Sequence, residues 1–252
     1  LRVGGSTYII GSVPGYIDAN GNPVGPETDS RVRIYRIRND YSTASDAELM
    51  LEAAELLNLT IRDITPQDIA AVREQYARDW EEWPIELGAP FNDLNQNGIY
   101  EPESGETPGV ASADQVIWFV MNDLNESAMS GFAGAPPLEL ELQFTSWAYK
   151  SAGPFANSVY KRLRLINKSE FTIDSMYIGQ WSDPDIASFR DDVVGCDSVL
   201  TMGFADNGPV TVTWQSPPAR SAGCVVLQGP LVVSVGDSGI FDGENICGCC
   251  DL

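Results

Sequence analysis

The feature that most restricts the fold is the run LELELQF, residues 138–144, in which apolar and polar side chains alternate strictly. A period of two places successive side chains on opposite faces of a β-strand. One face would carry the three leucines and Phe144, and the other Glu139, Glu141 and Gln143. The run therefore predicts a strand with one apolar and one polar face.

Several other segments also have the composition of short strands, bounded by clusters of Gly, Pro, Asn and Asp. They are TYIIG, RVRIYRIR, DQVIWFVM, SVYKRLRLIN, FTIDSMYIGQW, PVTVTW and CVVLQGPLVVSV. Asn20-Gly21 is typical of a hairpin turn, and turn signals recur about every 8–12 residues. The sequence therefore predicts a mainly β protein, a single antiparallel β-sandwich domain over residues 1–252.

Between about residues 44 and 82 the apolar period changes to that of helices. Ser45 and Glu48 have the spacing of a capping box, and Thr65 precedes Pro66 as a second helix start. The predicted apolar faces are Leu49, Ala53, Leu56 and Leu57 on the first helix, and Ile69, Val72, Tyr76 and Trp80 on the second. We expect a two-helix insertion between strands.

Composition excludes several classes of function. The chain has no histidine, which excludes Ser-His-Asp and Cys-His catalysis and histidine-ligated zinc. Its 36 acidic and 15 basic residues give a net charge of −21, which argues against nucleic acid and anionic membranes as partners. No apolar run reaches the roughly 18 residues of a membrane span. The negative charge fits bound cations or simple solubility equally well.

The acidic loop over residues 92–106 contains DLNQNGIYEPESGE, where side-chain oxygens at alternate positions precede Gly98. Short loops bind Ca²⁺ in this way, with about six to eight oxygen ligands. The predicted ligands are Asp93, Asn95, Asn97, the Ile99 carbonyl oxygen and at least one of Glu101, Glu103 and Glu106. Ser104 stands where such loops usually have their last glutamate, and no helices flank the loop. The alternative is an acidic hydrated turn.

A second acidic cluster lies in WSDPDIASFRDDVVGCD, from Trp181 to Asp197. Three interpretations stay open: a second cation site, a carboxylate pair for glycoside cleavage, and an exposed loop whose aspartates cap turns. The candidate metal ligands are Asp183, Asp185, Asp191 and Asp192. Trp147, Tyr149 and Trp181 are candidate glycan contacts, although tryptophans in a sandwich more often fill the core.

The five cysteines all lie in the last quarter of the chain. We expect that Cys196 and Cys224 form a disulfide with each other, or that one of them pairs into the Cys247–Cys250 cluster. An odd number leaves one cysteine unpaired or bonded outside the chain. Asn58, Asn125 and Asn167 begin N-glycosylation acceptor triplets.

Several longer strings carry a resemblance to a known family. They are DWEEWPIELGAPFNDLNQNGIYEP, ADQVIWFVMNDLNES, LINKSEFTIDSMYIGQWSDPDI and DDVVGCDS, within residues 30–245. Together they resemble the N-terminal region of large uncharacterised bacterial proteins secreted by the type IX system of Bacteroidota-like lineages. Those proteins usually end in a C-terminal sorting domain, so the resemblance implies that residues 1–252 correspond to a region ahead of such a domain. The resemblance implies export, an extracellular or cell-surface location and a β-rich body, and it supplies no catalytic residues.

The sequence thus predicts a secreted or cell-surface β-sandwich, stabilised by Ca²⁺ and structural or adhesive in role. Its expected partners are other copies of itself, in a filament or other assembly, or a cell-surface polysaccharide. Because the chain starts LRVGGSTYIIG without methionine, we expect a processed form or an excerpt. A carbohydrate-binding or glycoside-active module is the alternative function, and no residue is assigned a catalytic role.

Overall fold

The computed structural model describes residues 11–133, 136–173, 192–207, 221–229, 238–241 and 244–247, with isolated positions between 176 and 186. The chain divides into two compact units, Leu1–Thr172 and Ile173–Leu252, where the sequence predicts a single domain. Most of the predicted strand TYIIG lies outside the described residues.

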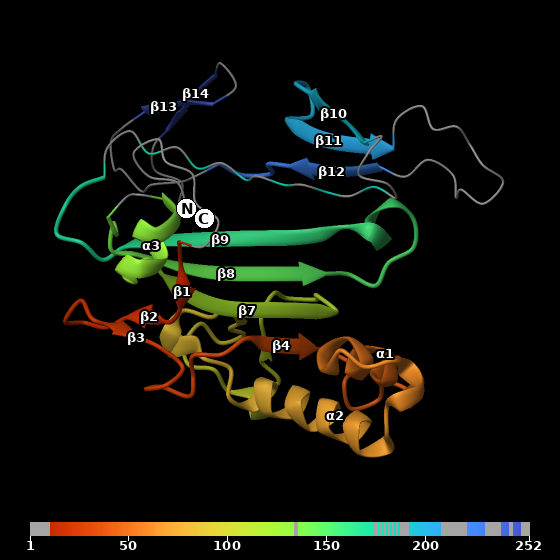
Figure 1. The fold of residues 1–252 in the computed structure, drawn as a ribbon. Coiled ribbons are helices and arrows are strands. Elements are labelled where there is room, and N and C mark those ends of the chain that lie inside the picture. Colours follow the sequence, from red (N-terminus) through yellow and green to blue (C-terminus); the bar gives the residue numbers. More distant parts are fainter. Residues whose placement is uncertain are drawn as a thin grey trace. The chain divides into compact units, whose positions relative to one another are not determined.

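The first unit is built on a five-stranded antiparallel sheet in the order β1-β7-β8-β9, with β4 also paired to β7 (Figure 1). The strands are β1 (Val13–Pro14), β4 (Tyr35–Arg38), β7 (Gln115–Asn122), β8 (Leu140–Ala148) and β9 (Val159–Asn167). Two short ribbons accompany it, β2 (Tyr16–Ile17) with β3 (Pro23–Val24), and β5 (Phe91–Asn92) with β6 (Thr107–Pro108). The predicted LELELQF strand is confirmed from Leu140 onward, where it forms the start of β8.

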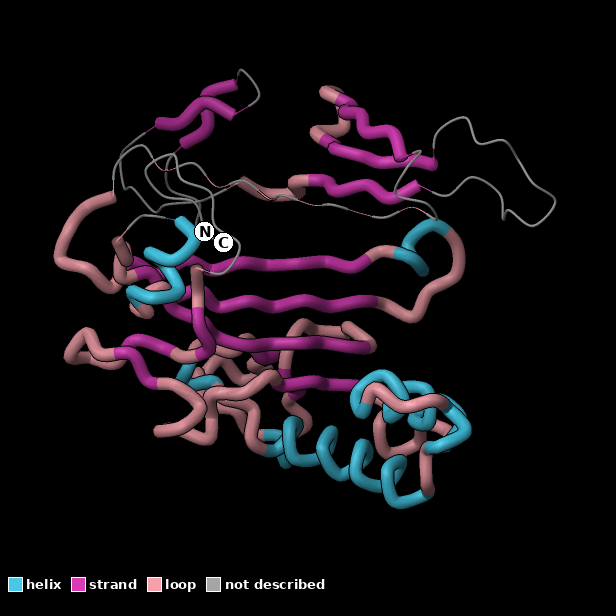
Figure 2. Tube along the Cα trace, in the orientation of Figure 1, coloured by secondary structure: helices cyan, strands magenta, loops and turns pink. Residues whose placement is uncertain are grey.

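The predicted two-helix insertion is also confirmed and follows β4 directly (Figure 2). Its elements are α1 (Asp46–Leu57), the 3-10 turn η1 (Ile61–Asp63) and α2 (Pro66–Glu81). Both helices begin with the predicted caps: Ser45 forms a capping box with Glu48, and Thr65 forms one with Asp68. The remaining helical elements are η2 (Ile85–Leu87), η3 (Pro102–Ser104), α3 (Glu126–Ala133) and η4 (Pro154–Asn157).

The apolar faces of these helices are partly as predicted. Leu49 and Ala53 are fully buried, and Ile69, Val72 and Tyr76 join them in a small core between α1 and α2. Leu56 and Leu57 are exposed by 40% and 46%, so the prediction that they share this buried face is wrong. They occupy the last turn of α1, which ends at Asn58 in the left-handed conformation.

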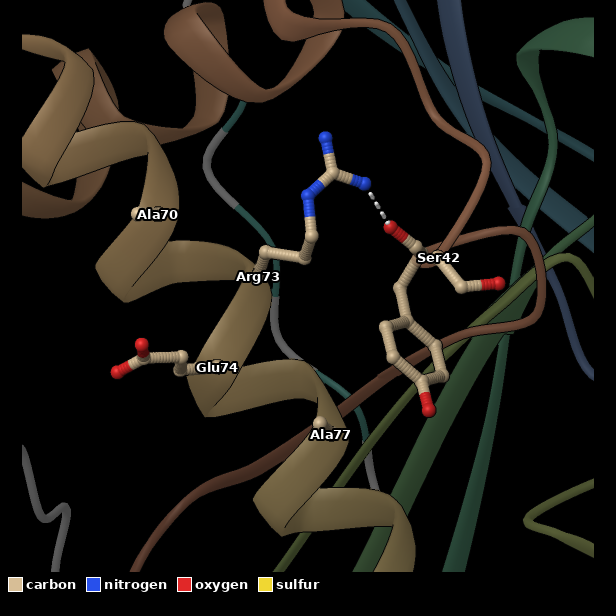
Figure 3. A pocket seen from close by; sticks show the side chains of 6 residues that line it. Ser42, Ala70, Arg73, Glu74 and Ala77 are labelled. Carbon is tan, nitrogen blue, oxygen red and sulfur yellow. Dashed lines mark hydrogen bonds between the residues drawn. The ribbon is translucent and has the colours of Figure 1, made fainter.

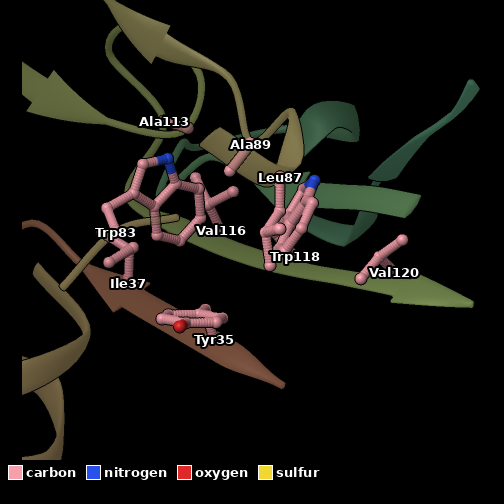
Figure 4. Close-up of a cluster of buried hydrophobic side chains, with 9 residues drawn as sticks. All are labelled: Tyr35, Ile37, Trp83, Leu87, Ala89, Ala113, Val116, Trp118 and Val120. Carbon is pink, nitrogen blue, oxygen red and sulfur yellow. The ribbon is translucent and has the colours of Figure 1, made fainter. Parts of the chain in front are cut away.

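The main core lies on one face of the sheet and is rich in aromatic side chains (Figure 4). Tyr35 on β4 meets Trp83 and Trp118 edge to face, with ring centroids 5.9 and 6.1 Å apart. The buried members are Tyr35, Ile37, Trp83, Leu87, Ala89, Ala113, Val116, Trp118 and Val120. The segment that follows α2 thus covers the centre of the sheet.

Of the polar face predicted for LELELQF, only Glu139, which precedes β8, is exposed. Glu141 and Gln143 are 3% and 6% exposed, and they bond to each other and to the backbone of β2 and η2. Glu141 accepts from the Ile17 N–H, and the Gln143 amide donates to the Leu87 carbonyl oxygen at 2.8 Å. These two side chains join distant parts of the chain instead of being hydrated.

The second unit contains a three-stranded antiparallel sheet, β10-β11-β12, and a hairpin of β13 and β14. The strands are β10 (Asp192–Asp197), β11 (Met202–Asn207), β12 (Ser221–Val225), β13 (Ser238–Phe241) and β14 (Glu244–Cys247). The predicted fold class is confirmed: the chain is mainly β, with antiparallel sheets and a helical insertion, an arrangement compatible with a β-sandwich.

Candidate metal centre in the acidic loop

The acidic loop is closed at its base and attached to the core at its middle. Strands β5 and β6 pair Phe91 with Pro108 and so bring the two ends of the loop together. Tyr100 lies in the middle of the loop, where its ring meets that of Phe91 edge to face and its hydroxyl donates to the Trp80 carbonyl oxygen of α2 at 3.0 Å. The loop is thereby linked to both the sheet and the helical insertion.

The first half of the loop folds around the Asp93 carboxylate. This group accepts hydrogen bonds from the Gly98 N–H at 2.8 Å and from the Asn97 N–H at 3.3 Å. Gly98 has a φ of +73°, a conformation in which most residues with a side chain are strained. Both interpretations of the loop, the cation site and the acidic hydrated turn, expect a turn at Asp93–Gly98.

Three of the predicted ligand side chains converge above this turn. The amide nitrogens of Asn95 and Asn97 each lie 2.9 Å from the same oxygen, Oε2 of Glu101. Their amide oxygens accept from the Asn97 and Ile99 N–H groups, at 3.0 and 2.7 Å. Asn95, Asn97 and Glu101 therefore form one polar cluster on the exposed side of the loop.

Glu106 has a different role from the other glutamates. It is 1% exposed, and its two carboxylate oxygens accept from the Leu94 N–H at 3.1 Å and the Glu101 N–H at 2.8 Å. It thus holds the two halves of the loop together from inside. Burial raises the pKa of the nearby Tyr100 hydroxyl, and the negative charge of Glu106 raises it further.

The donor set fits a hard cation in its chemistry, because it consists of carboxylate and amide oxygens. Asp93, Asn95, Asn97 and Glu101 would hold the ion, and Glu106 would support them. Glu103 is an exposed residue of η3. Ile99 could contribute only its carbonyl oxygen, because its side chain is a hydrocarbon without a ligand atom. Within the described residues, no three Cys, Asp or Glu side chains group as a metal site.

The second acidic cluster is only partly visible. Asp183, Asp185 and Asp191 lie outside the described residues, so the predicted second metal site stays a prediction. Asp192 accepts from the Ile186 N–H at 3.0 Å. Asp197 accepts from the Val199 and Leu200 N–H groups, at 2.9 and 3.0 Å. Asp197 therefore caps a turn, as one of the three interpretations expects.

The candidate glycan contacts are covered by neighbouring side chains. The Trp147 ring stacks on Tyr160, with centroids 5.6 Å apart and planes at 16°, and the Arg162 guanidinium lies 5.6 Å from the Trp147 centroid. Tyr149 meets the same Tyr160 ring edge to face at 5.8 Å. Both residues are half-buried against the main core. Trp181 lies outside the described residues.

The structure does not pair Cys196 with Cys224. Both thiols are exposed, and neither has a disulfide partner among the residues that the structure describes. In the register of β10, β11 and β12, Cys196 lies opposite Gly203 and Gly203 opposite Cys224, so a whole strand separates them. Two strand spacings amount to about 9–10 Å, beyond the roughly 7 Å between Cα atoms that a disulfide spans. Pairing with the Cys247–Cys250 cluster stays a prediction.

The acceptor asparagines for N-glycosylation are all exposed. Asn58 ends α1, and the Asn125 side chain accepts from the Ala128 N–H at the start of α3. The Asn167 amide nitrogen, the atom that would carry a glycan, donates to the Phe171 carbonyl oxygen at 2.6 Å. One of the two hydrogens on this nitrogen is therefore engaged in the turn.

Two surface hollows of about 370 Å³ are present in the first unit. One lies between α2 and the segment after β4 (Figure 3). Arg73 reaches across it and donates to the Tyr41 and Ala44 carbonyl oxygens. The other is lined by the buried pair Glu141 and Gln143. In both hollows these polar groups are engaged in holding segments of the chain together.

Among the described residues, no helix has the length and apolar character to cross a membrane. The chain matches no known protein-family model, no curated protein and no solved structure.

Proposed function

We propose that this chain is an extracellular or cell-surface structural protein whose β-rich body is stabilised by Ca²⁺ bound in the acidic loop. The observation that carries this proposal is the convergence of Asn95, Asn97 and Glu101 beside Asp93. Their loop is held in shape by the buried Glu106 and linked to α2 through Tyr100.

The composition of the loop gives the cation a physical role. Asp93, Glu101, Glu103 and Glu106 lie within fourteen residues and repel one another, and a divalent ion converts part of this repulsion into attraction. The amide oxygens of Asn95 and Asn97 each accept one backbone N–H and keep a second lone pair for the ion, which adds ligands without adding negative charge. Since the ion would bind only the folded loop, it would stabilise the first unit by about 2.7 kcal/mol at a hundred times its dissociation constant.

The extracellular location rests on the resemblance to secreted bacterial proteins and agrees with the character of the loop. A site with few carboxylates on the protein surface is typical of extracellular calcium modules, whose dissociation constants are about 10⁻⁴–10⁻³ M. Such a site would be filled only where calcium is abundant. The alternative of a carbohydrate-active module has less support, because Tyr160 and Arg162 cover the Trp147 ring.

The test is thermal unfolding of the full chain with Ca²⁺, with a chelator, and with Ca²⁺ added back. We expect the chelator to lower the melting temperature and Ca²⁺ to restore it. Asp93→Ala and Glu101→Gln should remove most of this difference, because each removes a negatively charged ligand.

The chain provides a matched control in the hairpin turn between β2 and β3. Asp18, Asn20 and Asn22 repeat the Asp-x-Asn-x-Asn spacing, and Asp18 accepts from the Asn20 and Asn22 N–H groups at 2.9 and 2.8 Å. Asp18→Ala should leave the response to Ca²⁺ unchanged. A melting curve that is the same with Ca²⁺ and with chelator would refute the proposed site.

A further inference from the structure

One hairpin of this acidic protein carries a net positive charge. Residues 142–169, which cover most of β8 and all of β9, contain five Lys or Arg and no Asp or Glu. The rest of the chain holds all 36 acidic residues and only ten of the 15 basic ones. Three of the hairpin's cations, Lys161, Arg162 and Arg164, are exposed on β9. The hairpin therefore attracts negatively charged surfaces, and the remainder of the same chain is negatively charged.

The strand that carries these cations is also an edge of the sheet. Among the described residues, β9 pairs with β8 on one side and with no strand on the other. Leu140 and Ala148, at the two ends of β8, direct their carbonyl oxygens to β7, where they accept from the Asp123 and Asp114 N–H groups. Even-numbered residues of β8 thus direct their backbone N–H and C=O groups to β7, and odd-numbered residues direct theirs to β9.

This alternation fixes which backbone groups of β9 point outward. The odd-numbered β8 residues lie opposite Tyr160, Arg162, Arg164 and Ile166, so these four direct their N–H and C=O groups to β8. The residues between them, which include Lys161, Leu163 and Leu165, direct theirs away from the sheet. The outer edge of β9 therefore offers a row of backbone donors and acceptors to another strand.

Apolar side chains accompany this edge. Val159 and Leu163 on β9 are 63% and 44% exposed, and Phe155 in the preceding turn is 63% exposed. Natural edge strands are commonly protected by lysine, proline or a bulge, and here the cations serve as the protection. Cations that repel a like-charged strand attract an acidic one.

We infer that the outer edge of β9 is a docking surface for a second copy of this chain, which adds an extended acidic segment to the sheet. The inference rests on the proposed structural function and names the surface through which copies associate. Because the basic edge and the acidic segment are different surfaces of one protein, the contact is head to tail and can propagate.

The test is sedimentation velocity of the full chain over a range of protein concentrations, in a fixed Ca²⁺ concentration. We expect association at an ionic strength of about 0.01 M and its loss at about 1 M, where the Debye length falls from roughly 30 Å to 3 Å. Lys161→Glu with Arg164→Glu should weaken association by at least about tenfold. The control pair Arg62→Glu and Arg78→Glu makes the same change of charge on the exposed surface of the helical insertion and should have a much smaller effect.

A second pair of variants tests the backbone of the edge. Leu163→Pro removes an outward N–H without removing a bond to β8 and should abolish association, whereas Leu163→Ala keeps the N–H and should retain most of it. Circular dichroism would verify that the variants are folded.

Wild-type protein that stays monomeric at low ionic strength would overturn the inference, as would equal effects of the two charge-reversal pairs. Monomeric protein that binds alginate through Lys161 and Arg164 would also overturn it, in favour of an anionic polysaccharide. Repeating the measurement with chelator separates this test from the calcium proposal, because neither the β9 edge nor its cations belong to the acidic loop.

Discussion

Replacement of Glu106 by glutamine tests whether a buried carboxylate holds the acidic loop together. Both oxygens of Glu106 accept backbone N–H groups, from Leu94 and Glu101. Glutamine has nearly the same shape but only one acceptor oxygen, and its NH₂ group would face the second N–H. The backbone N–H opposite the remaining oxygen would lose the charge of its acceptor, so that hydrogen bond would weaken. The other backbone N–H would face the NH₂ group, so that two donors would meet and that hydrogen bond would be lost.

The size of the effect follows from these two bonds. A hydrogen bond to a charged group contributes about 1.5–3 kcal/mol, and a buried N–H without a partner costs about 1–3 kcal/mol. Relief of repulsion among the loop carboxylates offsets part of the loss. We therefore expect Glu106→Gln to lower the free energy of unfolding by about 2–4 kcal/mol. For a protein of this size the melting temperature should fall by roughly 4–16 °C.

The assay is urea and thermal unfolding in chelator, followed by tryptophan fluorescence. Glu103→Gln is the matched control, because Glu103 is exposed in the same loop and loses the same charge. It should change the stability by less than about 0.5 kcal/mol. Equal stability of the two variants in chelator would refute the role of Glu106 in holding the loop together. A loss of stability of Glu106→Gln that occurs only when Ca²⁺ is present would show instead that Glu106 is itself a calcium ligand.

Two further predictions concern the helical insertion and the thiols. The Ser45 N–H and hydroxyl, followed by the charges of Lys150 and Arg38, lower the pKa of Glu48 from its ordinary 4.5 to about 2. This contribution to stability is present above pH 4.5 and is lost as the pH falls toward 2. Glu48→Gln should therefore make the free energy of unfolding less dependent on pH between these values. An unchanged pH dependence would contradict the capping box. For the thiols, peptide mapping without reduction should find no bond between Cys196 and Cys224, and such a bond would show that the strand order β10-β11-β12 is wrong.

The helical insertion could be predicted because its signals are local. Ser45 and Glu48 lie within one turn of each other, as do Thr65 and Asp68, and each pair forms its capping box without help from the rest of the fold. The strand that begins in LELELQF could also be predicted, because its apolar and polar residues alternate. The same period could not show that Glu141 is buried, since its partner Ile17 is 124 residues away.

The candidate metal site was likewise predictable only in its local part. The spacing of Asp93, Asn95 and Asn97 determines the turn, because their hydrogen bonds reach only two to five residues along the chain. The sequence left open which glutamate completes the cluster. That choice depends on the closure of the loop by β5 and β6, which places Glu106 inside and Glu101 beside the asparagines. The cysteine pairing likewise required the order of the strands.

The position of β4 beside β7 has a consequence for how the chain is made. Strand β4 ends at Arg38 and its partner begins at Gln115, so β4 leaves the ribosome before its partner strand exists. At about 5–20 residues per second, the intervening stretch takes roughly 4–15 s to synthesise. During that interval α1 and α2 can close their own small core, and Arg38 can bind Glu52 of α1. The insertion can thus contact β4 before β7 is available to pair with it.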